Sequence, residues 1–544
     1  MKFSYLSVLL AFAIQSVHAG PQYRSTRQSS ILINPDAQPG LPGPRIQSAV
    51  PAANHAATLN LNDIQGDILY AYQLAIIHQS SLTNGGRIGM KKKKEMFFFF
   101  SIKDAKTFKS KLPSKIAPLI TNTNQLLSVD TQPTTAVNIA FSHTGLLALN
   151  VTDNLGDSAF TGGQFKDASS IGDPGTSQWV PGFAGTNVHG VFLLASDTVK
   201  NVHDELARIK SILGNSISEI HRVHGAARPG DQEGHEHFGF MDGISQPAVQ
   251  GFTQQVLPGQ GDLLPAGEFL VGESGDSTTR PSWAKGGSFL VFRQMQQKVP
   301  EFNKYLMDHA LNVPGLTQQE NVDLLGARFI GRWKSGAPID LSSLRDDPSL
   351  GNDNTRNNNF TFDHPDIPGF DIATNQTFEL DAWFAEYKLT TDEPDHHIIR
   401  AGIPYGPEVT DYEHTSNASS TDPSLERGLA FVAYQSNINT GFRFLQQAWV
   451  NNANFFFGKA ILPISTHSAS LISLGPFSKI PRPGVDPIIG RSVNAPADTP
   501  RNVSGSDPLN STHIFTLDID FVVSRGGEYF FSPPISALTG ALAV

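Results

Sequence analysis

VHGVFLLASDTVKNVHDELARIKSILGN (Val188–Asn215) is the stretch of the chain from which its fold class is most directly inferred. It begins with a short apolar run, Val188–Ala195, that is typical of a strand. Apolar residues then recur at spacings of three and four, which predicts an amphipathic helix through Val199, Val202, Leu206, Ile209 and Leu213. Ser196 or Asp197 is suited to cap this helix, and Gly214-Asn215 to end it. A strand that leads into a helix predicts a mixed fold.

The same alternation continues along the chain. Further runs typical of strands are Phe97–Ile102, Val137–Phe141, Glu268–Val271, Ser288–Phe292 and Gly428–Gln435. Further helical patterns are Val299–Leu311, Gln318–Leu325 and Thr440–Val450. Strands and helices that alternate with short loops indicate an α+β or an α/β fold, and periodicity alone does not choose between them.

Composition excludes several classes of protein. The chain has 544 residues, of which 39% are apolar and 17% charged, so it is too hydrophobic for a disordered protein and long enough for roughly three average domains or two large ones. A formal net charge of −10 argues against a nucleic-acid binder. The absence of cysteine excludes a disulfide framework, zinc fingers, iron–sulfur clusters and cysteine nucleophiles.

The first residues have the pattern of a secretory signal peptide. In residues 1–19, an early Lys2 precedes the apolar run Tyr5–Ile14, which is too short to anchor the chain in a membrane. Residues 20–58, rich in Pro, Gln, Ser and Ala, are interpreted as a pro-segment or flexible tail. Six Asn-x-Ser/Thr sequons suit a secreted glycoprotein: Asn150, Asn359, Asn375, Asn417, Asn502 and Asn510. We therefore expect an extracellular protein that is not embedded in a membrane.

The densest cluster of polar residues is HEHFGFMDGISQP (His235–Pro247). Glu236 between His235 and His237 suggests a metal hydrolase, but no third ligand stands nearby, so this is the weaker hypothesis. Asp242 follows two phenylalanines, and a carboxyl group in apolar surroundings tends to have a raised pKa and to exchange protons. The alternative is that Asp242 only forms an Asp-Gly turn.

A second cluster is HHIIRAGIPYG (His396–Gly406). Arg400 follows a strand-like apolar pair and precedes a Gly/Pro loop, a position from which a guanidinium can bind an anion or a developing negative charge. A structural ion pair is an equally common role for such an arginine.

Several segments resemble one known family. GFMDGISQPAV (Gly239–Val249) is similar to the GxxDG signature of dye-decolorizing (DyP-type) haem peroxidases. Further segments resemble the secreted fungal members, in chain order: Arg280–Arg293, Val299–Leu306, Leu324–Leu341, Arg356–Phe360, Ile398–Thr410, Arg427–Ser436 and Asp486–Gly490. The resemblance implies an α+β protein of two ferredoxin-like domains with antiparallel sheets, residues 59–235 and 236–544, with the haem pocket mainly in the C-terminal domain.

The resemblance also assigns roles to residues. It makes Asp242 the distal carboxylate, which carries a proton between the two oxygens of hydrogen peroxide, and Arg400 the distal arginine. Leu429 and Phe431 match the apolar pair on the distal face, although ordinary core packing explains them equally well. It implies one haem b per chain, and bulky organic reductants such as dyes or phenolics oxidised at the haem edge or at the surface. Electron transfer would then pass through aromatic residues such as Tyr405 or Trp383.

The proximal side departs from the family. Members carry a histidine ligand in a Cys-Pro-x-x-Ala-His-like segment, but here Asp371 or Ile372 stands at the aligned position. His364 lies upstream on the expected side and is the candidate ligand that remains. Asp486 matches the acid that hydrogen-bonds the proximal imidazole.

Two hypotheses follow. The first is an active secreted peroxidase, a monomer or weak oligomer, with a relocated or non-standard proximal ligand. The second is a pseudoperoxidase that has lost tight haem binding and acts as a binding or structural protein. The retained distal residues favour the first hypothesis, and the altered proximal segment favours the second.

Overall fold

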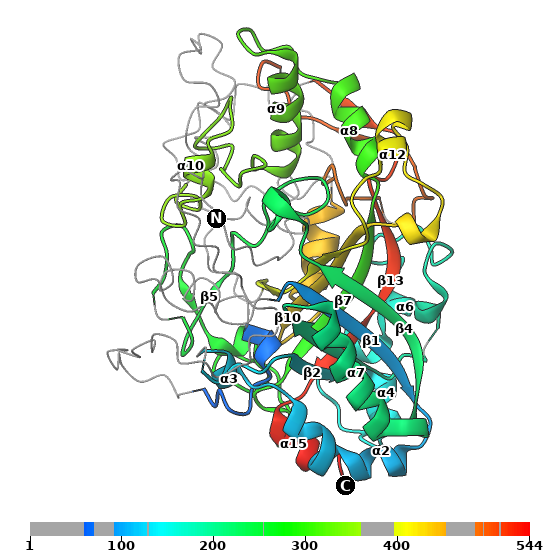
Figure 1. Cartoon of the computed structure of the whole chain (residues 1–544). Coiled ribbons are helices and arrows are strands. Elements are labelled where there is room, and N and C mark those ends of the chain that lie inside the picture. The colour runs from blue at the N-terminus through cyan, green and yellow to red at the C-terminus, as the bar shows by residue number, and fades with distance from the viewer. Residues whose placement is uncertain are drawn as a thin grey trace, which may run out of the picture.

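The computed structural model describes residues 59–69, 92–127, 130–185, 187–253, 255–360, 396–452, 485–492, 494–510 and 513–544. Nine strands of these residues form one sheet (Figure 1). They are β1 (Lys94–Ile102), β2 (Ala136–Phe141), β3 (Gly190–Ser196), β4 (Ile217–Ala226), β7 (Ser288–Gln297), β8 (Ile399–Arg400), β9 (Ile403–Tyr405), β10 (Gly428–Gln435) and β13 (Val522–Ser532). Every pairing within this sheet is antiparallel.

The N-terminal half has a ferredoxin-like arrangement. Its strands lie in the order β2-β3-β1-β4, with α2 (Ala105–Lys111) on the connection from β1 to β2 and α7 (Val199–Leu213) between β3 and β4. The helix α7 buries Val202, Leu206, Ile209 and Leu213, four of the five positions that the apolar spacing assigns to its inner face. The predicted helix is thus confirmed.

The C-terminal half repeats this arrangement. Its strands lie in the order β13-β7-β10 followed by β8 and β9, which pair with opposite ends of β10. The helices α8 (Val299–Asp308) and α9 (Gln318–Ile330) follow β7, while α13 (Phe442–Phe444) and η11 (Leu445–Val450) follow β10. The α+β class with two ferredoxin-like, antiparallel units is confirmed.

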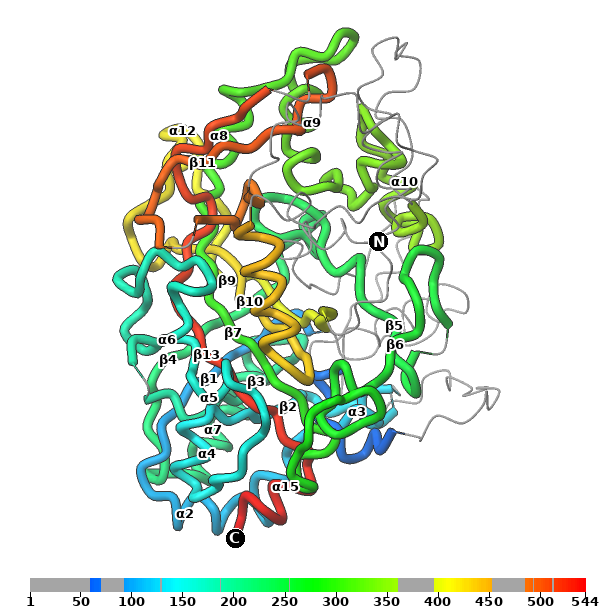
Figure 2. Tube along the Cα trace, turned by 180° about the vertical axis from the view of Figure 1, so that it is seen from behind, coloured from blue at the N-terminus to red at the C-terminus, as the bar shows by residue number. Residues whose placement is uncertain are grey.

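The two halves join at both edges, so the sheet closes on itself. Phe531 of β13 pairs with Phe141 of β2, and Tyr405 of β9 pairs with Gly225 of β4. Figure 1 shows α8, α9 and α12 (Asp411–Ser416) at one end of the sheet, and α2, α4 (His143–Ala148), α7 and α15 (Ile535–Thr539) at the other. The opposite view shows α13 and η11 alongside β10 (Figure 2). The remaining α-helices and strands are α3 (Thr123–Leu126), α5 (Ser158–Gly162), α6 (Gln164–Asp167), α10 (Pro348–Gly351), β5 (Ala248–Val249), β6 (Leu263–Leu264), β11 (Arg501–Val503) and β12 (Phe515–Leu517).

The closed sheet has apolar side chains on both faces, which explains the run of four phenylalanines in β1. Phe97 and Phe99 point into the enclosed space and contact Phe292, with ring centroids 4.9 and 4.8 Å apart. Phe98 and Phe100 point outward to the layer of helices. Because successive side chains of a strand alternate between faces, a strand covered on both sides carries a continuous apolar run.

Two local expectations are wrong. The N-cap of α7 is Thr198, whose hydroxyl accepts a bond from the Asn201 N–H, in place of Ser196 or Asp197. Glu268–Val271 is not a strand, because Ala266–Glu268 forms a short 3₁₀ turn and the following residues turn back toward β7. A short buried apolar run has the same composition in a strand and in a packed turn.

Glu528 of β13 provides a test of this buried sheet. Its carboxyl group is buried and accepts bonds of 2.8 Å from the N–H groups of Gln164 and Tyr529, and burial raises its pKa to about 7. The folded protein therefore binds this proton more tightly than the unfolded chain. The free energy of unfolding should decrease as pH rises from about 4.5 to about 7, by at most about 3 kcal/mol.

We expect Glu528→Gln to remove this part of the pH dependence, because the amide is neutral at every pH. Denaturant unfolding at pH values of about 5 and about 8 measures the effect. Glu205→Gln, on α7, is the control and should keep the wild-type slope. An unchanged slope in Glu528→Gln would show that Glu528 is already ionised in the folded protein.

Candidate active site

The loop between β4 and β5 is held in shape by the carboxylate of Glu236. This group accepts bonds of 2.8 Å from the Phe238 N–H and 2.9 Å from the Phe240 N–H, and a further bond from the Gln297 amide. Burial raises the pKa of Glu236, while the backbone bonds oppose that shift. Glu236 is therefore a structural carboxylate that fixes the loop on which Asp242 stands.

Asp242 and Arg400 meet in a buried ion pair. Nη1 of Arg400 lies 3.2 Å from Oδ1 of Asp242, and the two side chains are 2% and 0% exposed. The Gly243 N–H also donates to Oδ1. Arg400 Nη2 donates to the carbonyl of Ser245 at 2.9 Å. The pair joins residues that are 158 positions apart in the chain, and it brings the two polar clusters of the sequence together.

Gln246 fixes the backbone of Arg400. Its side-chain oxygen accepts a bond of 3.2 Å from the Arg400 N–H, and its nitrogen donates a bond of 2.9 Å to the Arg400 carbonyl. The amide of Gln246 thus extends β8 as a neighbouring strand would. These two bonds fix the position of the Arg400 backbone relative to Asp242.

A second buried guanidinium lies near the pair. Arg332 donates to the carbonyls of Gly336 (3.0 Å) and Asn357 (2.6 Å), and also to the side chain of Asn358. Burial and the neighbouring charge of Arg400 lower the pKa of Arg332 to about 9, so it remains a cation at neutral pH. Among the described residues, no carboxylate forms an ion pair with it. The site therefore carries two guanidinium groups and one paired carboxylate, which leaves a positive charge. That charge suits a ligand that bears carboxylate groups.

Leu429 and Phe431 lie on the same face of the sheet as Arg400. Ala433 pairs with Arg400, so residues 429, 431 and 433 of β10 share the face to which Arg400 belongs. This face lies under the helical layer, and Phe431 contacts Phe442 of α13 with ring centroids 5.8 Å apart. An apolar strand face beside the guanidinium groups of Arg400 and Arg332 fits a flat apolar molecule that carries carboxylates. Haem is such a molecule.

Tyr405 lies on the opposite face of the sheet. Its ring is buried in the enclosed core, and its hydroxyl donates a bond of 2.8 Å to Glu426. Burial raises its pKa well above the ordinary value for tyrosine. Trp383, His364, Asp371 and Ile372 lie outside the described residues.

Asp486 is a buried acid whose Oδ1 accepts bonds of 2.9 Å from the N–H groups of both Ile488 and Ile489. Burial raises its pKa to about 6, against these backbone bonds. Its own N–H donates to the carbonyl of Val450, the last residue of η11. The backbone of the following turn thus holds the Asp486 carboxyl group in place. A fixed carboxyl group can orient a hydrogen-bond donor next to it.

The metal-hydrolase hypothesis gains no support from the geometry. Glu236 is occupied by loop hydrogen bonds, and Nε2 of His237 lies 2.9 Å from the Tyr405 carbonyl oxygen. Across the part of the chain that the structure describes, no group of three or more His, Asp or Glu side chains is arranged to hold a metal ion.

Three contributors to the site were not predicted from the sequence: Ser245, Gln246 and Arg332. Ser245 and Gln246 stand within the motif around Asp242, and this position could have marked them as site residues. Their roles, however, depend on contact with a strand more than 150 residues away. Arg332 lies in one of the segments that resemble the family, and nothing in the sequence distinguishes it from a surface arginine.

Comparison with known proteins identifies the family. A family model described as the DyP dimeric alpha+beta barrel domain matches residues 87–229, and one described as the Dyp-type peroxidase C-terminal domain matches residues 235–459. Together these models cover well over half of the chain, which belongs to the DyP-type peroxidase family.

Similar proteins with known names support the same family assignment. The chain is 56% identical to Peroxidase 2 of Mycetinis scorodonius over 565 aligned positions, covering 100% of both chains. It is 51% identical to a dye-decolorizing peroxidase of Mycena epipterygia, covering 99% of this chain and 98% of the relative. The crystal structure of a decolorizing peroxidase from Auricularia auricula-judae is 48% identical and superposes with a TM-score of 0.75 over 89% of this chain and 100% of that chain. No helix among the described residues is both long enough and apolar enough to span a bilayer.

The amide of Gln246 can be tested by replacing it with an apolar side chain of similar size. In Gln246→Leu, Arg400 loses both backbone bonds, so its guanidinium should shift from its position beside Asp242. We expect the rate of peroxide-dependent oxidation to fall about 10- to 100-fold, together with a loss of about 1–3 kcal/mol of stability from the unpaired backbone groups. Gln447→Leu, which removes a single bond to the Ser170 carbonyl, should keep the wild-type rate. Equal rates in the two variants would refute the positioning role.

Proposed function

We propose that this chain is a secreted haem peroxidase that uses hydrogen peroxide to oxidise dyes, phenolics or other organic reductants. The observation that carries the proposal is the buried Asp242–Arg400 ion pair, which stands beside the apolar face of β10. Two relatives support the reaction class: Peroxidase 2 of Mycetinis scorodonius, which aligns with 100% of this chain, and the dye-decolorizing peroxidase of Mycena epipterygia, which aligns with 99% of it.

The cofactor that we propose is one haem b per chain. When bound, haem supplies an iron atom that peroxide oxidises and that organic reductants then reduce again. Leu429 and Phe431 would lie against the macrocycle, and Arg332 would balance the charge of its carboxylates. Asp486 would accept a hydrogen bond from the proximal ligand and so orient it.

Asp242 is the proton carrier in this proposal. Hydrogen peroxide must lose a proton from one oxygen and gain a proton on the other before water can leave. Both hydrogen bonds from Arg400 and Gly243 fall on Oδ1 of Asp242. A proton can therefore reside on Oδ2 while both bonds persist, and be passed to the second peroxide oxygen.

Arg400 stabilises the negative charge that develops when the O–O bond breaks. Its guanidinium is buried, and its backbone is fixed by Gln246, so it needs no reorganisation during the step. Leu429 and Phe431 restrict this side to small molecules. Bulky reductants would be oxidised at the haem edge or surface, with Tyr405 and Trp383 as the proposed electron carriers.

Asp242→Asn tests the proton carrier. The amide keeps the shape and the bonds to Oδ1 but does not exchange a proton at neutral pH, so we expect peroxide-dependent turnover to fall about 10²- to 10⁴-fold. The Soret absorbance per protein should stay at the wild-type value. Asp231→Asn, on the exposed turn before the loop, should have no effect. Wild-type turnover in Asp242→Asn would reject the assignment.

Haem binding separates the two hypotheses drawn from the sequence. We expect a Soret band in the full-length protein after expression with added haem, with about one haem per chain. His364→Ala then tests the candidate ligand, because loss of the band identifies His364 and an unchanged band removes it. Protein that stays colourless favours the pseudoperoxidase.

Secretion is proposed from the signal peptide, the pro-segment and the six sequons. We expect expression in a eukaryotic host to release the protein into the medium, with a new N-terminus after residue 19 or within residues 20–58. Treatment with an endoglycosidase should lower its mass. Retention of an uncleaved chain inside the cells would contradict this proposal.

A further inference from the structure

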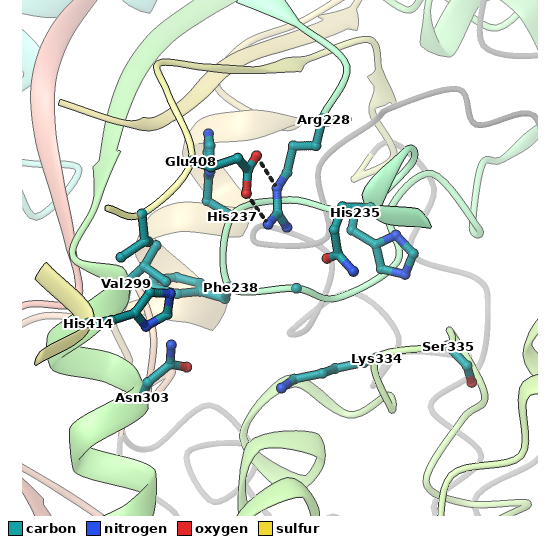
Figure 3. Close-up of a pocket in the computed structure, with 13 residues that line it drawn as sticks. Arg228, His235, His237, Phe238, Val299, Asn303, Lys334, Ser335, Glu408 and His414 are labelled. Carbon is teal, nitrogen blue, oxygen red and sulfur yellow. Dashed lines mark hydrogen bonds and ion pairs between the residues drawn. The ribbon is translucent and has the colours of Figure 1, made fainter. Parts of the chain in front are cut away.

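The loop that carries Asp242 is anchored at its start by a second ion pair. Arg228 binds Glu408 through two bonds, of 2.9 and 2.6 Å, in the wall of a cavity of about 330 Å³ (Figure 3). Arg228 also donates a bond of 2.6 Å to the carbonyl of Glu236. The Asp242 side of the site is thus fixed by charged side chains as well as by the loop itself.

Arg400, on the other side of the site, lies on a very short strand. β8 consists of two residues, and among the described strands its only partner is β10. Ile399 and Ala401 are buried in the enclosed core. Arg400 points to the opposite face, because successive side chains of a strand alternate. Groups in the enclosed core can therefore hold the backbone of residues 399–401 without contacting the guanidinium.

A cluster of charged side chains lies in this enclosed core. Nζ of Lys92 lies 3.0 Å from Oδ1 of Asp67 and 3.0 Å from Oε1 of Glu95, and the three side chains are 6%, 4% and 0% exposed. The hydroxyl of Tyr434 donates a bond of 2.6 Å to Oδ2 of Asp67. Lysine is almost never buried without a partner, so the partners of Lys92 determine where its ammonium group is held.

The charges of the cluster balance at neutral pH. Burial alone would lower the pKa of Lys92, but the charges of Asp67 and Glu95 raise this pKa above the ordinary value, so Lys92 is a cation. Burial raises the pKa of Glu95 to about 8, so its carboxyl group is protonated at neutral pH. Asp67 then supplies the one negative charge that balances Lys92. A buried pair of this kind needs further hydrogen bonds to offset the loss of solvation.

The further bond of Lys92 leads to the strand that carries Arg400. Nζ donates a bond of 3.0 Å to the carbonyl of Ala401, the residue after Arg400. The residue before Arg400 is linked to the same cluster, because Ile399 pairs in the sheet with Tyr434. The cluster therefore supports the backbone on both sides of Arg400, from the face opposite to its guanidinium.

We propose that Lys92 is a positioning residue for Arg400, because it fixes the Ala401 carbonyl from the enclosed core as Gln246 fixes the Arg400 backbone from the loop. The effect on the reaction rests on the proposed function, in which Arg400 acts on peroxide. The rigidity of residues 400–401 can be measured without haem, so a failure of the proposed function is distinguishable from a failure of the positioning role.

The double variant Lys92→Gln/Asp67→Asn tests the positioning role. Its two amides can bond each other in place of the ion pair, but the shorter side chain at position 92 does not reach the Ala401 carbonyl. In the protein without haem, we expect the backbone amides of Arg400 and Ala401 to exchange hydrogen for deuterium at least about 10-fold faster, relative to the amides of β2. In the haem-loaded protein, the second-order rate constant for peroxide should fall about 10- to 100-fold, while the later step with the organic reductant keeps its rate.

Glu95→Gln is the matched control within the same cluster. It exchanges one neutral group for another at neutral pH and leaves the bond from Lys92 to Ala401 in place, so both measurements should give the wild-type values. An ion pair with a purely structural role would lower the stability of the double variant without changing the relative exchange at residues 400–401 or the rate constant for peroxide.

Lys92→Met removes the same bond and replaces the double variant if that variant does not fold. Wild-type relative exchange at Arg400 and Ala401 in the variant that folds would overturn the proposal, and so would an equal change in Glu95→Gln. Faster exchange in a protein that binds no haem would confirm the support of the Arg400 backbone and reject the proposed function alone.

Discussion

The burial of Arg400 against Asp242 is the constraint on which the site depends. Placing two charges in a core costs several kcal/mol per ion unless each is paired and hydrogen-bonded. Here the Gly243 N–H donates to the Asp242 carboxylate, the Ser245 carbonyl accepts from the Arg400 guanidinium, and the Gln246 amide bonds the Arg400 backbone. Glu236 in turn fixes the start of the loop. The loop shape and the position of Arg400 are therefore determined together.

The closed sheet explains how such a pair can be built from distant segments. Two ferredoxin-like units share their edges, so β10 is flanked by β7 on one side and by β8 and β9 on the other, while β8 pairs with β10. β10 separates two environments, with Tyr405 and Tyr434 toward the enclosed core and Leu429 and Phe431 toward the helices. The Asp242–Arg400 pair on the helical side is buried, and exclusion of water strengthens electrostatic interactions within the site.

Sequence reasoning predicted elements and motif residues well, and contacts between segments poorly. The apolar spacing of Val199–Leu213 identified both the helix and its buried face, and the DyP-like motifs identified Asp242 and Arg400. The choice of α+β required the family resemblance, because strand order is a property of pairing and not of periodicity. Gln246 and Arg332 act through contacts far along the chain, which no local pattern records. Glu268–Val271 was misassigned because an apolar run in a packed turn has the composition of a strand.

The central claim is that Asp242 and Arg400 act as one unit on peroxide. The most direct measurement is a double-mutant cycle on the haem-loaded protein, with the rate of reaction with hydrogen peroxide measured by stopped flow for Asp242→Asn, Arg400→Leu and the double variant. If the two residues act together, the double variant is about as slow as the slower single variant. If the two effects on the rate multiply, the residues act independently and the account is contradicted.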